Sequence, residues 1–187
     1  MRRLTEVEIE AILTVAYSES RRDATMILLQ FFHAMRSDEI CSLKVDDVSL
    51  ETSSITIRRK KGSLTTVQAL HCHRGNPRLD EPKMLKAWLA ERTAGEYLFP
   101  TQKAVKMDRR SYWRLFRGYA IAAGIPLEAA HPHSVKHASA SYLLRQGADL
   151  ATVRQHCGHA SMSSTLRYLG TTDEMASKTA QTLFSRM

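Results

Sequence analysis

Apolar residues recur at helical spacing along most of the chain, and this pattern predicts a mainly helical protein. Thr5 and Glu8 form a capping box, so we expect a first helix to begin there and to run to about Tyr17. A second helix is expected to begin near Asp23, which can cap it, and its nearly uniform apolar sequence indicates that it is buried. Capping residues and glycine or proline boundaries predict the remaining helices from residue 37, at 80–92, 108–124, 134–145 and 149–158, and from residue 172.

The hydrophobic period changes in the first half of the chain, where a short antiparallel sheet is predicted. Apolar and polar residues alternate over 54–58, as in a half-buried strand, and residues 64–70 return as a second strand after a turn at 59–63. We find no internal repeat, low-complexity tract or flexible linker in the sequence. The pattern therefore predicts one α+β domain over 1–187, mostly helical with a small antiparallel sheet.

Composition narrows the class of partner. The chain has 187 residues, and its 27 Lys and Arg against 19 Asp and Glu give a formal net charge of +8. This excess favours a polyanionic partner, nucleic acid first, although a merely basic soluble protein has the same composition. No apolar run approaches the roughly 18 residues of a membrane span, and no apolar stretch follows Arg2 and Arg3 to make a signal peptide. Three cysteines without a C-x-x-C pair suit a reducing compartment, so we expect a cytoplasmic protein.

Two basic clusters are candidate nucleic-acid contacts. Arg110, Arg114 and Arg117 share one face of the helix expected after residue 108, and three arginines in line can follow a phosphate backbone. A solvated helix face has the same pattern. The predicted hairpin carries four adjacent cations, which repel one another unless an anion lies against them, and this favours nucleic acid. These four are Arg58, Arg59, Lys60 and Lys61.

Six residues suggest chemistry when they are taken together. Singly, each has a structural explanation: Arg36 could cap the preceding helix, His159 could end a helix, and Tyr168 could be a core tyrosine. The six, in chain order, are Arg36, Lys60, His133, Lys136, His159 and Tyr168.

Their order resembles the sequence boxes of the tyrosine recombinase, or phage integrase, family. Residues 131–137 (HPHSVKH), 157–161 (CGHAS) and 165–168 (TLRY) are similar to the family's H-x-x-R, G-H and nucleophilic-tyrosine boxes. Residues 33–43 (HAMRSDEICSL) resemble its first arginine box, and 58–66 resemble its lysine-bearing β-hairpin. Ordered elements at matching spacing are far more specific than any single motif. The resemblance covers nearly the whole chain and is greatest to the small Fim-type invertases that control fimbrial phase variation.

The resemblance implies an activity and a role for each residue. Members of the family break and rejoin double-stranded DNA through a 3′-phosphotyrosyl link, which stores the bond energy, so neither ATP nor a cofactor or metal is implied. Tyr168 would be the nucleophile, and a hairpin lysine would protonate the leaving 5′ oxygen. His133 would help to move the tyrosine proton, while Arg36 and His159 would bind the phosphate oxygens.

Some details depart from the family pattern or stay open. The H-x-x-R box ends here in Lys136, which keeps the charge of arginine but loses its two-pronged guanidinium. The catalytic lysine is Lys60 or Lys61, and strand parity favours Lys60, opposite the core-facing Ile55 and Ile57. Large family members also carry an N-terminal DNA-clamping domain that this sequence lacks, so the chain is either naturally minimal or a fragment.

The resemblance also implies partners. We expect double-stranded DNA with inverted-repeat recombination sites, a tetramer assembled on that DNA, and association with the bacterial nucleoid. The tail over 172–187 has an apolar stripe and is the candidate segment for exchange between protomers, although it could pack on its own domain instead. DNA inversion and DNA integration or excision are both compatible with the sequence.

Two other interpretations compete with a DNA-cleaving recombinase. A degenerate relative that binds DNA without cutting it would explain Lys136, but every other catalytic position is present. Residues 71–73 (HCH) and 156–159 (HCGH) contain possible metal ligands, yet neither has the spacing of a structural zinc site. We therefore interpret His71 and His73 as loop residues.

Overall fold

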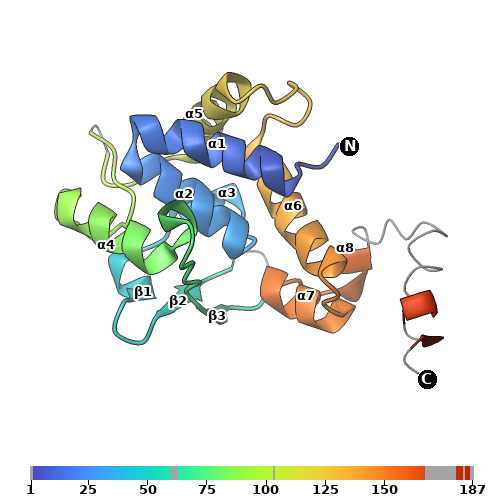
Figure 1. Cartoon of the computed structure of the whole chain (residues 1–187). Helices are drawn as coiled ribbons and strands as arrows, with labels where there is room; N and C mark the ends of the chain where they lie inside the picture. The colour runs from blue at the N-terminus through green and yellow to red at the C-terminus, as the bar shows by residue number, and fades with distance from the viewer. Residues whose placement is uncertain (1, 60–62, 103, 167–179, 183, 186–187) are drawn as a thin grey trace.

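The structure is a computed structural model that describes residues 2–59, 63–102, 104–166, 180–182 and 184–185. Its helices are α1 (Glu6–Glu19), α2 (Arg21–Phe32), α3 (Ser37–Cys41), α4 (Glu81–Glu91), α5 (Arg109–Ala122), α6 (Pro132–Arg145), α7 (Leu150–Cys157) and α8 (Met162–Leu166). Two short 3-10 turns are η1 (Val45–Asp47) and η2 (Pro77–Leu79). The strands β1 (Val48–Ser49), β2 (Ser54–Ile57) and β3 (Thr66–Ala69) form an antiparallel sheet in chain order. This arrangement, drawn in Figure 1, confirms the predicted mostly helical α+β fold.

The capping residues read from the sequence explain most of the helix boundaries. The capping box of Thr5 and Glu8 is present at α1, and Asp80, Asp108 and Asp149 each accept a backbone N–H at the start of a helix. The expected cap at the second helix was wrong. Ser20 caps α2 by accepting the N–H of Asp23, whose own side chain is buried. The tail expected to begin at residue 172 lies largely outside the described residues.

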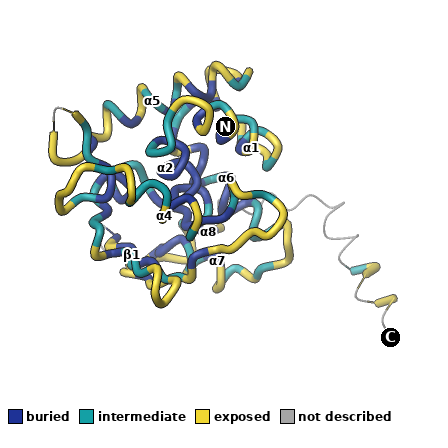
Figure 2. The backbone as a smooth tube through the Cα atoms, turned by 60° about the vertical axis from the view of Figure 1, so that its left-hand side comes forward, coloured by how far each residue is buried: buried dark blue, intermediate teal, exposed yellow. Residues whose placement is uncertain are grey.

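The centre of the fold is α2, whose burial was expected from its apolar sequence. One side of the helix, including Ile27 and Leu28, packs with α1, α5 and α6. Another side, including Met26 and Leu29, packs with the sheet, α4 and the segment around Phe99. Figure 2 shows α2 as a buried stretch surrounded by more exposed elements. Within the described ranges, no helix is long and apolar enough to cross a lipid bilayer.

A buried glutamine on α2 ties three elements together. The side-chain amide of Gln30 donates to the carbonyl oxygens of Met35 and Pro132, at 3.2 and 3.1 Å. Its oxygen accepts the hydroxyl of Tyr112 on α5 at 2.6 Å. Met35 precedes α3 and Pro132 begins α6. Gln30 therefore fixes the N-terminal ends of α3 and α6 relative to α2. Arg36 and His133 lie at these two ends.

We predict that Gln30→Met destabilises the protein by about 2–4 kcal/mol, because each stranded buried polar group costs roughly 1–3 kcal/mol. Urea unfolding followed by circular dichroism measures the change. Tyr112→Phe is the matched control, since it strands only the Gln30 oxygen. Equal losses of stability in the two variants would contradict a linking role for the Gln30 amide.

Candidate active site

Arg36 lies at a sharp corner between α2 and α3, where its guanidinium is held by a neighbouring carboxylate. Ala34 makes the turn with a φ of 47°, in the left-handed region that alanine rarely adopts. Arg36 then caps α3, and its backbone N–H donates to Glu39 Oε2 at 2.7 Å. Its Nη1 donates to Glu39 Oε1 at 2.8 Å and to Ser63 Oγ at 3.3 Å. The Arg36 side chain is 37% exposed, so part of it can meet a ligand.

Glu39 is buried and ionised among cations. Burial acts to raise the pKa of this carboxyl, but the charge of Arg59, the N–H of Arg36 and the charge of Lys136 together hold it below its usual value. An ionised carboxylate in this position partly neutralises the surrounding positive groups. It also fixes the direction of the Arg36 guanidinium.

Lys136 reaches the same place from α6. Its ammonium donates to the carbonyl oxygens of Ala34 at 2.6 Å and Cys157 at 3.0 Å, and the residue is 1% exposed. Burial, followed by the nearby charge of Arg59, lowers the pKa of Lys136 to about 7. In this structure the ammonium faces backbone carbonyls and not open space, so a phosphate contact requires it to exchange one of these bonds.

Two histidines flank the cations. His159 follows the left-handed Gly158 that ends α7, and its Nδ1 lies 3.0 Å from Thr165 Oγ1. Burial and the charges of Lys136 and Arg36 lower the pKa of His159 to about 4, so the ring is neutral at pH 7. His133, in the first turn of α6, also has a lowered pKa, because the protein partly shields its ring from water and because positive groups lie nearby. Its neutral ring is in the form that can accept a proton.

The structure therefore brings Arg36, His133, Lys136 and His159 close enough for their charges to interact. The predicted Lys60, its alternative Lys61 and the predicted nucleophile Tyr168 lie outside the described residues. Described residues beside them do reach the site. Ser63 accepts from Arg36, and the N–H of Leu64 donates to the carbonyl of Gly158 at 3.3 Å.

One expected DNA contact is corrected by the structure. Arg59 has no exposed side-chain area, and its guanidinium is bound to Glu39 and to backbone carbonyls. A buried group whose two terminal nitrogens both bind protein acceptors cannot also lie on a DNA surface. The sequence contained the signal, because Arg59 continues the alternation of the inward-facing Ile55 and Ile57, both 0% exposed.

The other predicted DNA-binding arginines are on the surface or beside a cleft. Arg58 is 61% exposed on its side chain and pairs with Asp47. Arg114 is exposed, with Nη2 3.4 Å from Ser111 Oγ. A cleft of about 660 Å³ opens beside His133. Its lining residues are Ser37, Arg109, Arg110, Trp113, Arg117, His131, Pro132 and His133.

Sequence reasoning missed three residues of this region. Glu39 has no role among the sequence-based expectations, although its spacing of three from Arg36 at the helix cap is that of a capping box. Arg109 and Trp113 also line the cleft, and the guanidinium of Arg117 lies 5.0 Å from the centre of the Trp113 ring. An aromatic side chain 41% exposed on a basic helix was the available signal.

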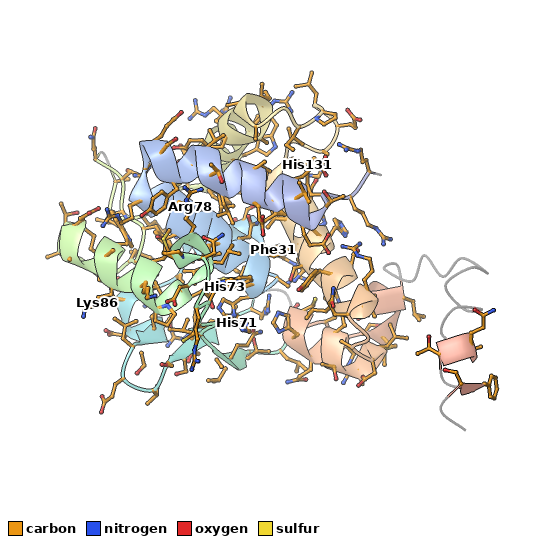
Figure 3. The ribbon with its side chains drawn as sticks, in the orientation of Figure 1. Phe31, His71, His73, Arg78, Lys86 and His131 are labelled. Atoms are coloured by element: carbon orange, nitrogen blue, oxygen red, sulfur yellow. The ribbon has the colours of Figure 1, made fainter. Side chains whose placement is uncertain are left out.

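His71 and His73 lie away from this site. Both belong to the segment between β3 and α4, and Figure 3 shows His131 in another part of the molecule. The His71 ring stacks on His33 with centres 5.7 Å apart, and its backbone N–H donates to Glu81. Among the described residues, no group of three or more His, Cys, Asp or Glu side chains is arranged to hold a metal ion.

Comparison with known proteins identifies similar chains. Residues 2–175 match the phage integrase family. The type 1 fimbriae regulatory protein FimE of Escherichia coli K12 is 31% identical over 175 residues, which cover 89% of this chain and 84% of FimE. The tyrosine recombinase XerA of Pyrococcus furiosus is 30% identical over 169 residues, covering 88% of this chain.

The fold also matches a solved structure. The crystal structure of XerA recombinase has a TM-score of 0.80 and 26% identity, and the match covers 97% of this chain and 65% of that one. The chain spans 56% of the length of the Pyrococcus furiosus protein. The similarity therefore covers nearly all of this chain, and little more than half of that relative.

Gly158 provides a test of the packing behind His159. A Cβ atom placed there would lie 2.6 Å from Arg59 Nε, and the residue has a φ of +63°. We predict that Gly158→Ala costs at least about 3 kcal/mol in urea unfolding, because it displaces Arg59 from a buried ion pair. Gly147→Ala is the control, since Gly147 also has a positive φ but a Cβ there meets nothing within 4 Å.

The control variant should lose only the roughly 1–2 kcal/mol of the left-handed backbone. Similar losses in both variants would mean that the approach of Arg59 to Gly158 adds nothing to stability.

Proposed function

This chain belongs to the phage integrase family, and we propose that it is a site-specific recombinase that cleaves and rejoins double-stranded DNA through a phosphotyrosyl intermediate. The FimE and XerA relatives are a fimbrial regulator and a tyrosine recombinase by name. Both DNA inversion and DNA integration or excision fit this proposal. We further propose that the protein acts on the bacterial nucleoid in the cytoplasm, where its DNA substrate lies.

One observation carries the proposal: three separate segments deliver four residues to a single site, Arg36 from the α2–α3 corner, His133 and Lys136 from α6, and His159 from the end of α7. The buried carboxylate of Glu39 holds Arg36 in place before any ligand arrives. Positive groups fixed in advance stabilise the charge that develops on a phosphate in its transition state. An arriving phosphate also raises the pKa of Lys136, because a nearby negative charge favours the ammonium form.

In the proposed reaction, the Tyr168 oxygen bonds to the scissile phosphorus while the bond from phosphorus to the 5′ oxygen breaks. His133 accepts the phenol proton, and its lowered pKa keeps the ring ready to do so. A hairpin lysine, Lys60 or alternatively Lys61, gives a proton to the 5′ oxygen. Attack by a 5′-hydroxyl on the phosphotyrosine then rejoins a strand and releases Tyr168. Arg36 and His159 bind the non-bridging oxygens.

The proposed DNA surface continues from this site along α5. Arg110 and Arg117 share the cleft with His133, so phosphates next to the scissile one can be bound there. Trp113 adds an aromatic face beside Arg117. Arg114 and Arg58 are exposed and extend the same positive surface.

A DNA-binding relative that does not cleave is the less favoured function. Lys136 is its only support, and the amino group of this lysine still lies within the cluster, bound to the Ala34 and Cys157 carbonyls. Lysine offers a phosphate one strong contact where arginine offers two. We therefore expect lysine at position 136, in place of the family arginine, to reduce the rate of DNA cleavage without abolishing it.

Assembly is proposed to involve the tail over 172–187. Four protomers are needed to exchange strands between two duplexes, and a segment passed between neighbours would connect their sites. Phe184, part of the apolar stripe predicted for this tail, is 71% exposed. An exposed aromatic side chain of this kind suits insertion into a groove on a neighbouring protomer.

We predict that Tyr168 becomes covalently attached to DNA. Duplexes that bind the protein are first selected from a random inverted-repeat library, and a nick is then placed beside the cleavage position so that the short product diffuses away. A denaturing gel should show a slower protein band for the parent chain. Tyr168→Phe should abolish this band with nearly unchanged binding, because one hydroxyl contributes little to an electrostatic interface.

Tyr17→Phe is the control, since Tyr17 is a surface tyrosine stacked under Arg78 and remote from the site. Its covalent band should equal that of the parent. A band that persists in Tyr168→Phe would assign the nucleophile to another residue.

Deleting residues 173–187 should impair synapsis more than binding to a single site. The selected duplex, carrying one or two sites, is used in a gel-shift assay to compare the two steps. We expect single-site affinity within about twofold of the parent and strongly reduced paired complexes, because the phosphate contacts that dominate affinity lie elsewhere. Equal loss of both steps, or aggregation of the shortened chain, would favour a tail that packs on its own domain.

A further inference from the structure

Arg59 is a buried arginine that connects segments on opposite sides of the site. Its Nη1 donates to Glu39 Oε2 at 2.9 Å and to the Ala34 carbonyl at 3.0 Å. Its Nη2 donates to the carbonyls of His33 at 3.0 Å and His156 at 2.7 Å. Arg59 itself follows β2, so one guanidinium joins the sheet, the α2–α3 corner and α7.

On one side, Arg59 acts on the residue that fixes Arg36. Glu39 receives Arg36 on Oε1 and Arg59 on Oε2. The two arginines therefore share a single carboxylate, and each limits the rotation of its side chain. Burying a guanidinium is costly unless it is paired and hydrogen-bonded, so this arrangement persists only while Glu39 stays in place.

On the other side, Arg59 supports the backbone that presents His159. It binds the His156 carbonyl near the C-terminal end of α7, where the helix dipole favours a positive group. Its side chain also packs directly against Gly158, where no Cβ atom could be accommodated. His159 is the next residue, so the position of its ring depends on this packing.

Lys136 also connects the α2–α3 corner to the end of α7. Both Lys136 and Arg59 donate to the Ala34 carbonyl, and each donates also to one of the last carbonyls of α7. Because both groups donate to the Ala34 carbonyl, the Arg59 guanidinium lies next to the Lys136 ammonium. A lysine suits position 136 in this chain because the adjoining space already contains a guanidinium.

We propose that Arg59 is a positioning residue that fastens the corner carrying Arg36 to the end of α7 carrying His159, in parallel with Lys136 and without touching DNA. Its effect on DNA cleavage rests on the function proposed above. Its effect on the geometry of the site does not.

The test compares Arg59→Met and Arg59→Lys with the parent chain in full length. Arg92→Met is the matched control, because Arg92 also donates to two backbone carbonyls but lies away from the site. Single-turnover covalent trapping on the selected nicked duplex should fall by about 10²-fold in Arg59→Met, the usual effect of a small misplacement of reacting groups. DNA affinity should stay within about twofold, since contacts to phosphate are unchanged. Arg59→Lys should recover part of the rate, and Arg92→Met should match the parent.

A second readout needs no cleavage. Lysine labelled with ¹³C allows the Lys136 side chain to be titrated by NMR, with Lys136→Gln identifying its signal. The midpoint should move to higher pH in Arg59→Met, because a like charge has been removed, and should stay unchanged in Arg92→Met. Other groups that act on Lys136 are common to both variants. They are Arg36, Glu39, His133, His137, Cys157 and His159.

The outcomes separate the two proposals. A folded Arg59→Met that traps DNA at the parental rate overturns the positioning role, as does a loss of binding that matches the loss of cleavage. If Arg59→Met does not fold, Arg59→Lys decides, and parental trapping with an unmoved Lys136 titration overturns the role. If the parent traps no DNA, the recombinase function fails. The positioning role of Arg59 is then tested by the Lys136 titration and by the NMR signals of the His159 ring. If neither changes in Arg59→Met, the proposal is overturned.

Discussion

The constraint on which the site depends is the buried C-terminal end of α2. The last carbonyl groups of a helix have no partners within the helix, and here they are surrounded by protein and not by water. This end of α2 and the corner that follows it find donors on distant segments: Phe32 accepts from His156 at 2.8 Å, and Ala34, two residues beyond the helix, accepts from Arg59 and Lys136. The need to satisfy these carbonyls draws the end of β2, α6 and α7 together. The catalytic candidates lie on the same segments, so the hydrogen bonds that complete the core also assemble the site.

This packing gives the site an electrostatic character before DNA is bound. Three cations and one carboxylate share a small region from which water is largely excluded, so positive potential dominates there. Burial first, and then these neighbouring positive charges, lower the pKa of Lys136 to about 7 and that of His159 to about 4. Among the described residues of this region, Glu39 is the one buried carboxylate, so part of the positive charge has no negative partner. A phosphate can supply that partner, and groups fixed in advance would hold the anion in one orientation.

Much of this could be predicted from the sequence, because helix caps and hydrophobic periods are local signals. Thr5, Asp108 and Asp149 identified helix starts, and the family boxes identified Arg36, His133, Lys136 and His159 as members of one site. The surroundings of these residues could not be predicted, because they depend on which backbone carbonyls lack partners after folding. Lys136 takes the place of the arginine in the H-x-x-R box, but its ammonium binds the Ala34 and Cys157 carbonyls. Arg59 was grouped with its basic neighbours, although the inward side of its strand determines its position. The roles of Lys60 and Tyr168 stay predictions.

The residues that donate to the Phe32 and Ala34 carbonyls are far from them in sequence, and this has a consequence for folding during synthesis. The donor to Phe32 is 124 residues away, and Lys136 is 102 residues from Ala34. Contacts of such long range form late, after the entropy of closing large loops has been overcome. A chain still emerging from the ribosome therefore has α2 and the sheet without the donors from α6 and α7. Such a chain cannot align these groups, so the proposed cleavage of DNA would become possible only when the last helices of the domain have docked.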